Sequence, residues 1–306
     1  MIYLNSAKES WIVDRFRKEW YEHNSSISTK FIPRSNTIWL IAPWTWSKIN
    51  SRNLEKKKVI CTIHHLDMDK FDKEQEKDFL KRDKFVDLYH TISYKTSDQV
   101  KKVTNKEIKM IPFWLNQNIW FEISDKKNLR EKYNFSSDNY LIGSFQRDTE
   151  GFDLKSPKLS KGPDRFINIV ESLKNEHKNL HVVLTGKRRH YVIEELRKRD
   201  IQFSYYEMAN FKTINELYNC LNLYIVSSRV EGGPQSIFEC SLIKTPIIST
   251  DVGIASEILS PESIFDMNNF SNAKPNTTYA YQNIQKYLIP KGFDEFKNII
   301  GDFIEN

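Results

Sequence analysis

Short apolar segments alternate with longer amphipathic stretches along most of this chain of 306 residues. In the first part the apolar segments predict strands, and the stretches between them have the spacing of helices. The strands are expected at 2–5, 37–44, 58–65, 86–93 and 108–114, and the helices at 9–23, 70–84 and 94–104. Strands and helices in alternation indicate a mostly parallel α/β sheet.

The pattern stops over residues 116–139, which are polar, contain no apolar run and predict a linker with one short helix, and then starts again. The second series predicts strands at 140–145, 180–186, 201–207, 223–228 and 245–250, and helices at 163–177, 190–199, 213–221, 235–243, 280–289 and 292–305. We therefore expect two Rossmann-like, doubly wound α/β domains, 1–118 and 119–290. Residues 291–306 are expected to form a C-terminal helix that packs back on the first domain. Ligands of such sheets bind outside the carboxyl ends of the strands, so a site in the cleft between the domains is expected.

Composition narrows the class of protein further. The three cysteines, Cys61, Cys220 and Cys240, are far apart, which argues against a disulfide framework or a zinc site. We find no signal peptide and no apolar run long enough for a membrane span, so a cytoplasmic protein is expected. The net charge of +6 divides into +7 for residues 1–118 and −1 for 119–306. That excess favours an anionic partner such as a membrane surface, although a solvated lysine-rich surface explains it equally well.

One segment, LYIVSSRVEGGPQSIFECSLIKTPIISTDVG at 223–253, concentrates residues that suit chemistry. A predicted strand is followed by Glu231, by the pair Gly232-Gly233, and by a helix that contains Glu239. Backbone N–H groups at a helix start bind anions, and glycines let a ligand approach them closely. A carboxylate can also accept hydrogen bonds from two neighbouring hydroxyls. The segment thus suits a ligand with both phosphate and sugar groups.

These residues resemble the retaining glycosyltransferases of GT-B fold, most closely family 4, also called group 1. Glu231 and Glu239 match the E-x7-E motif of that family. Further matches occur in the expected order, namely GSFQR at 143–147, SKGPDRF at 160–166, VVLTG at 182–186 and TPIISTDVG at 245–253. In the first domain, VICTIHHLD and IKMIPFWLN are similar to the corresponding family segments. The resemblance implies two Rossmann-like domains around a nucleotide-sugar cleft.

The resemblance also assigns roles to individual residues. His64 would lie beside the reacting centre, and Glu231 would face the donor sugar, so these two are the expected catalytic residues. Glu239 would bind the ribose hydroxyls. The remaining expected donor contacts are with the diphosphate, the nucleotide pocket and the sugar, and they are Arg147, Lys161, Gly186, Gly232, Gly233, Pro234, Gln235 and Ser236.

The implied function is transfer of a sugar, hexose-like, from a nucleoside diphosphate sugar to a glycan or lipid-linked acceptor. The resemblance implies retention of configuration and a role in polysaccharide or glycoconjugate biosynthesis. Arg147, Lys161 and the helix start after Gly233 supply the positive charge that a leaving diphosphate needs. We therefore expect no metal and no cofactor other than the donor substrate. The acceptor is expected on the basic first domain, with peripheral contact to the inner face of an anionic membrane.

Other interpretations remain open at this level. Asp67 and Asp69 form a D-x-D after a predicted strand, a pattern that binds a metal in other glycosyltransferases. A catalytically inactive nucleotide- or glycan-binding module would keep the same fold, and a nucleic-acid-binding protein would rest on charge alone. The segment 148–159 is longer than usual for the family. Trp39, Trp44 and Trp46 suit core packing, sugar stacking or membrane contact.

Overall fold

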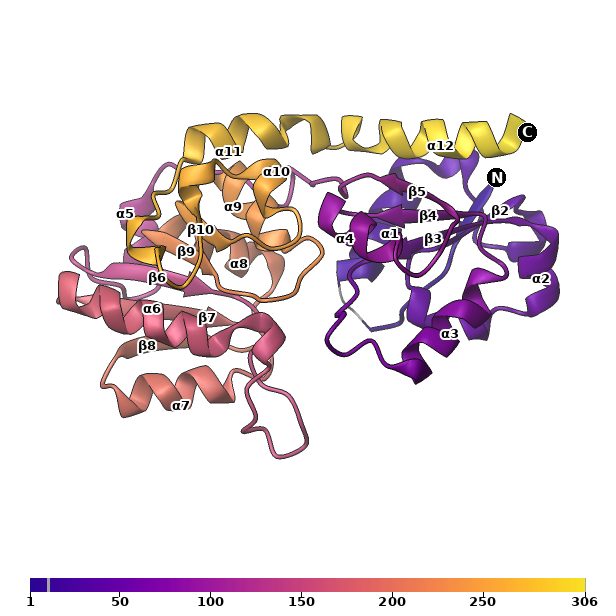
Figure 1. Cartoon of the computed structure of the whole chain (residues 1–306). Helices are drawn as coiled ribbons and strands as arrows, with labels where there is room; N and C mark the ends of the chain where they lie inside the picture. The colour runs from indigo at the N-terminus through magenta and orange to yellow at the C-terminus, as the bar shows by residue number, and fades with distance from the viewer. Residues whose placement is uncertain (10–11, 306) are drawn as a thin grey trace. The chain divides into compact units, whose positions relative to one another are not determined.

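The computed structural model describes residues 1–9 and 12–305 and divides the chain into two compact units (Figure 1). Unit 1 is Met1–Trp114 together with Ile289–Asn306, and unit 2 is Leu115–Leu288. The domain boundaries expected from sequence, after residues 118 and 290, lie four and two residues away from these. Two positions of the expected helix at 9–23, residues 10 and 11, lie outside the described residues.

Unit 1 is built on a parallel sheet of five strands whose order follows the chain, β1-β2-β3-β4-β5. The strands are β1 (Ile2–Leu4), β2 (Thr37–Leu40), β3 (Lys58–Ile63), β4 (Leu88–Thr91) and β5 (Glu107–Met110). The helices are α1 (Ile12–His23), α2 (Ser51–Lys56), α3 (Lys73–Asp83), α4 (Tyr94–Val100) and the C-terminal α12 (Asp294–Glu305).

Alternate residues of these strands enter two different cores, as the period of two in a strand requires. On β2, Trp39 packs in a cluster with residues of α1 and α12, whereas Ile38 and Leu40 pack with α2, α3 and α4. Phe293 and Phe296, at the start of the C-terminal segment, lie among the aromatic rings of the first cluster. The C-terminal segment therefore completes the core of unit 1.

Unit 2 contains a parallel sheet of six strands in the order β11-β10-β9-β6-β7-β8, so the order reverses between β6 and β9. The strands are β6 (Tyr140–Ser144), β7 (Leu180–Thr185), β8 (Gln202–Tyr206), β9 (Leu223–Val226), β10 (Ile247–Thr250) and β11 (Ile264–Phe265). The helices are α5 (Lys126–Lys132), α6 (Pro163–Glu176), α7 (His190–Lys198), α8 (Phe211–Cys220), α9 (Gln235–Ile243), α10 (Ala255–Ile258) and α11 (Thr277–Ile284).

The six-stranded sheet is covered on both faces. Helices α6 and α7 pack on one face with Ile142 and Val182, and α8, α9 and α11 pack on the other with Leu141 and Val183. Strands buried on both faces read as apolar runs, which is why β6, β7 and β9 are visible in the sequence. The reversal of strand order places a crevice-forming switch point at the carboxyl ends of β6 and β9.

The prediction of two Rossmann-like parallel-sheet domains is confirmed. The ten strands expected from sequence are all present, and the two-residue β11 and the short helices α2 and α10 were not foreseen. Among the described residues, no helix is both long enough and apolar enough to cross a bilayer.

Candidate functional site

In unit 2, two loops at the carboxyl ends of the strands are pressed against each other. Gly162, just before α6, has φ +62°, and a Cβ at this position would collide with the carbonyl of Ser227. The Ser227 Oγ donates to the Gly162 carbonyl at 2.8 Å. Because the backbones approach so closely, only glycine fits here. The loop with the SKG segment and the loop after β9 are therefore packed tightly together and joined by a hydrogen bond.

Arg229, which is partly exposed, forms further hydrogen bonds between the same two loops. Its guanidinium donates to both carboxylate oxygens of Asp164, at 2.7 and 2.6 Å, and its backbone N–H donates to the Ser160 carbonyl at 2.8 Å. Asp164 lies in the first turn of α6, where the helix dipole also favours a carboxylate. The hydrogen bonds from Arg229 lower the pKa of Asp164.

Two predicted site residues form an ion pair at this junction. The Lys161 ammonium donates to Glu231 Oε1, and the two side chains are only 24% and 11% exposed. Ser228 Oγ lies 3.3 Å from the same carboxylate oxygen. The Gln146 amide donates to the Lys161 carbonyl at 2.9 Å, which ties the end of β6 to the pair. The structure thus brings three of the sequence motifs together.

Positive charge gathers beside this ion pair. Arg147 follows β6 and is fixed by a 2.8 Å hydrogen bond from its Nε to the Thr149 carbonyl. Lys158 is half-buried, and its pKa is lowered first by burial and then by the neighbouring charges of Lys161 and Arg147. The charges of Lys161 and Arg147 therefore both act on Lys158, and an anion bound here would be attracted by all three.

Lys158 was not among the residues predicted from sequence. It lies in the long segment 148–159, and its backbone N–H donates to the Asp148 carbonyl at 2.7 Å. That bond folds the insertion back toward the end of β6. The only signal in the sequence was the unusual length of this segment, which also contains the fully exposed Phe152.

A buried ion pair holds the loop that carries Arg147. The Nε of Arg189 lies 2.6 Å from Asp148 Oδ2, and both side chains are almost completely buried. Arg189 Nη1 also donates to the Ser144 carbonyl at 2.8 Å and to the Gln146 carbonyl. Burial raises the pKa of Asp148, and the charge of Arg189 opposes that shift. Breaking one partner of such a pair is costly, so this pair fixes the ends of β6 and β7.

Glu239 lies on α9, and its side chain is buried. It is 7% exposed, and its Oε2 accepts a 2.9 Å hydrogen bond from the Tyr218 hydroxyl. Burial, and then the nearby Glu239, raise the pKa of Tyr218. The ring of Tyr218 also lies against Phe145 and Tyr224, at 4.7 and 5.4 Å. An aromatic cluster of three residues therefore supports this carboxylate.

The predicted glycines have different conformations. Gly186 follows β7 with φ +89°, and its carbonyl accepts a hydrogen bond from the Tyr205 hydroxyl at 2.8 Å. Among the described glycines, the left-handed positions do not include Gly232 or Gly233. Instead Gly253 has φ +52°, and a Cβ there would collide with the carbonyl of Gly232. The position that requires glycine is thus Gly253, which packs against the backbone of Gly232.

The remaining predicted donor residues surround the start of α9. Pro234 is the N-cap and offers no side-chain acceptor, so the first N–H groups of this nine-residue helix have no side-chain cap. The Gln235 amide reaches the Gly233 carbonyl at 3.5 Å. Ser236 forms a hydrogen bond with the buried Tyr224.

His64, the other predicted catalytic residue, belongs to unit 1 and follows β3. Its Nε2 lies 2.9 Å from the Ile41 carbonyl, and because a carbonyl only accepts, Nε2 carries the proton. Burial lowers the pKa of His64 to about 4, although the bond to Ile41 opposes the shift. At neutral pH the ring is therefore uncharged, with a lone pair on Nδ1.

The D-x-D residues Asp67 and Asp69 lie in a turn after His65 and are at least partly exposed. Among the described residues, no three His, Cys, Asp or Glu side chains are grouped so that they could hold a metal ion.

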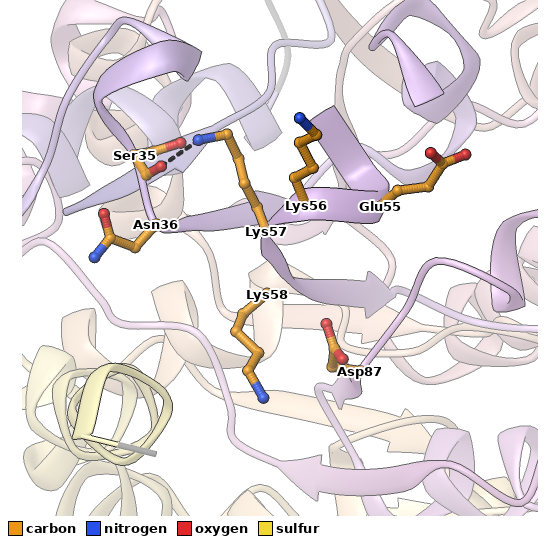
Figure 2. A pocket seen from close by; sticks show the side chains of 7 residues that line it. All are labelled: Ser35, Asn36, Glu55, Lys56, Lys57, Lys58 and Asp87. Carbon is orange, nitrogen blue, oxygen red and sulfur yellow. Dashed lines mark hydrogen bonds between the residues drawn. The ribbon is translucent and has the colours of Figure 1, made fainter. Parts of the chain in front are cut away.

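A shallow depression of about 460 Å³ lies at the opposite, amino-terminal edge of the sheet of unit 1 (Figure 2). Lys57 donates to the Ser35 carbonyl, and Asp87 accepts a 2.7 Å hydrogen bond from the Val59 N–H. Exposed Lys56 and Lys58 flank these groups. This mixture of charges contributes to the basic surface expected from the sequence, and the membrane contact remains a prediction.

Residues 154–287, all in unit 2, match the model of the glycosyl transferases group 1. The O-antigen biosynthesis glycosyltransferase WclY of Escherichia coli is 25% identical over 162 residues. That match covers 52% of this chain and 42% of the relative, so the chain spans less than half the length of the curated relatives it matches.

Solved structures resemble the whole chain. HepE of Anabaena, determined in complex with UDP and glucose, has a TM-score of 0.74 at 12% identity and covers 98% of this chain and 99% of that one. Sucrose-phosphate synthase of Thermosynechococcus elongatus has a TM-score of 0.68 at 13% identity and covers 96% and 76%. The resemblance expected from the sequence motifs is confirmed: the chain has the GT-B fold, and residues 154–287 match the model of the group 1 glycosyl transferases.

Proposed function

We propose that the protein is a glycosyltransferase that moves a sugar from a nucleoside diphosphate sugar to an acceptor. The observation that carries this proposal is the convergence of three cations, Arg147, Lys158 and Lys161, beside the carboxylate of Glu231. Cations suit a diphosphate, and a neighbouring carboxylate suits the hydroxyls of a sugar. Few other ligands need both within one small site.

We assign the diphosphate to the three cations and to the N-terminus of α9. Backbone N–H groups of Gly232, Gly233 and the first turn of the helix would contact phosphate and sugar oxygens, with Pro234, Gln235 and Ser236 lining the same turn. Glu239 would accept hydrogen bonds from the ribose hydroxyls, and Gly186 would leave room for the nucleotide. Glu231 would bind the hydroxyls of the transferred sugar.

UDP is the proposed nucleotide. HepE was solved with UDP and with UDP-glucose, and it resembles this chain along its entire length. At 12% identity that likeness concerns the fold, so the base and the sugar rest on the experiment below.

The proposed reaction proceeds with retention of configuration on one face of the sugar. The bond between C1 and the β-phosphate oxygen breaks, the acceptor oxygen bonds to C1, and the acceptor proton passes to the departing diphosphate. Lys161, Lys158 and Arg147 would stabilise the negative charge that develops on that leaving group. His64, uncharged and with a lone pair on Nδ1, would accept a hydrogen bond from a substrate hydroxyl rather than donate a proton.

We propose a glycan or a lipid-linked sugar as the acceptor, with contact to an anionic membrane, and catalysis without a divalent metal. The metal-free proposal rests on the three cations, which supply the charge that a bound metal would otherwise provide.

A donor screen tests the proposal. The full chain is incubated with UDP-, GDP-, ADP- and CMP-sugars, and thermal stability and donor hydrolysis are measured with and without EDTA. We expect a UDP-sugar to raise the unfolding midpoint and to be hydrolysed slowly, in EDTA as well as in Mg²⁺. Stabilisation by none of these donors contradicts the function, and activity that only Mg²⁺ or Mn²⁺ restores contradicts the metal-free mechanism.

A further inference from the structure

The three tryptophans of residues 39–46 have different surroundings. Trp39 is 1% exposed, and its indole N–H donates to the Thr62 hydroxyl at 2.8 Å inside the core. Trp46 is partly buried and packs 6.0 Å from Phe85. Trp44 is 48% exposed. Core packing therefore explains two of these tryptophans but not Trp44.

Trp44 is held in place although its ring is open to solvent. It is the second residue of a 3-10 turn, Pro43–Lys48, that follows the carboxyl end of β2. Buried Asn5 fixes the start of that turn, donating to the Ala42 carbonyl at 2.8 Å and accepting from the Ala42 N–H at 3.0 Å. The indole N–H of Trp44 donates to Glu9 Oε1 at 3.0 Å. Since its only polar atom is engaged, what the exposed side chain offers a ligand is its aromatic ring.

Hydrogen-bonding groups lie beside this ring. The centroid of His64 is 5.8 Å from that of Trp44, and Nδ1 of His64 keeps a lone pair. Glu9 adds a carboxylate. A pyranose ring has apolar C–H faces and a rim of hydroxyls, so an aromatic face bordered by hydrogen-bond acceptors matches it.

We propose that Trp44 is the platform on which a pyranose ring of the acceptor stacks, with Glu9 and His64 accepting hydrogen bonds from its hydroxyls. This inference rests on the proposed function and names the acceptor as a glycan. An anionic lipid surface fits the site less well, because the carboxylate of Glu9 adjoins the indole and would repel lipid phosphates. Trp44 is then a binding residue and Asn5 a positioning residue.

The test uses the full chain labelled with 5-fluorotryptophan and observed by ¹⁹F NMR. Methyl glycosides of glucose, galactose, mannose and N-acetylglucosamine are titrated separately, and the resonance missing in Trp44→Phe identifies Trp44. We expect at least one glycoside to shift the Trp44 resonance saturably and to leave that of Trp46 unchanged. If no glycoside shifts it, or if only vesicles of anionic phospholipid perturb it, the proposal is overturned.

Kinetics separate this inference from the function on which it rests. In Trp44→Ala we expect kcat/KM for the glycoside acceptor to fall about tenfold, while UDP still raises the unfolding midpoint as in the parent protein. Phe31→Ala, a matched control because Phe31 is 64% exposed and precedes the amino end of β2, should change neither value. If UDP does not raise the unfolding midpoint of the parent protein, the proposed function is refuted. Unchanged acceptor kinetics in Trp44→Ala, with UDP binding intact, refutes the platform alone.

Discussion

Lys161 and Glu231 form an ion pair although they lie 70 positions apart in the chain. One residue precedes α6 and the other precedes α9, so the pair joins two loops at the carboxyl edge of the sheet. Its partners Ser228 and Gln146 extend the connection to the ends of β9 and β6. A site organised in this way needs little rearrangement to receive a ligand.

Replacement of Lys161 tests the role of this pair. We expect Lys161→Met to weaken UDP binding about ten- to hundredfold, because each hydrogen bond to a charged group contributes about 1.5–3 kcal/mol. Calorimetry on the folded variant measures the loss. Lys178→Met is the matched control, since Lys178 is exposed and precedes β7 at the other edge of the sheet. Equal affinities of both variants would remove Lys161 from the site.

Lys158→Met should separate stability from binding. Burial, and then the neighbouring charges of Lys161 and Arg147, lower the pKa of Lys158, so its charge is unfavourable in the free protein. We therefore expect this variant to unfold at the same temperature as the parent or higher, while UDP stabilises it less. As pH rises through the lowered pKa, the parent should lose affinity for UDP, and the variant should lose less. A variant with lower intrinsic stability and unchanged UDP binding would show that Lys158 is structural.

The residues that line this edge were easier to predict from the sequence than the ion pair that supports it. Glu231, Glu239, Arg147 and Lys161 lie in short segments with recognisable order, and the strands before them are apolar runs. Asp148 and Arg189 are single charged residues in loops, where no periodicity shows that they will meet in the core.

The solvent exposure of the three tryptophans could not be predicted from the sequence either. Trp39, Trp44 and Trp46 look alike in sequence, but their burial depends on which element covers each of them. The C-terminal segment supplies Phe296, which lies 257 positions after Trp39 in the chain and packs against it. Only the folded structure shows that Trp44 remains half-exposed.

Gly162→Ala should destabilise the protein. The left-handed φ alone costs about 1–2 kcal/mol, and the collision with the Ser227 carbonyl adds to it. Gly301→Ala is the opposite control: Gly301 lies in α12, an added Cβ there meets no described atom within 4 Å, and the change should stabilise by about 0.5–1 kcal/mol. Denaturant unfolding measures both variants. Effects of the same sign would contradict the tight packing of the two loops.

The uncharged state of His64 has a consequence for pH. Its pKa is about 4 in the folded protein and about 6.5 when unfolded, so the unfolded state binds more protons between these values. Stability should therefore fall as pH is lowered from about 6.5 toward 4, and His64→Gln should lessen that fall. Titration of the ring by NMR, with the resonance identified from His64→Gln, measures the pKa directly. A midpoint near pH 6.5 would mean that the ring is not desolvated.

The most direct measurement is calorimetry of UDP, GDP, ADP and CDP with the full chain and with Glu239→Gln. The central claim is that the edge of unit 2 formed by Arg147, Lys161, Glu231 and Glu239 binds a nucleoside diphosphate. We predict that UDP binds with the highest affinity and that Glu239→Gln, which keeps the size of the side chain but removes its charge, binds UDP at least about tenfold more weakly. Binding of none of the four nucleotides, or equal binding by a folded Glu239→Gln protein, would contradict the claim.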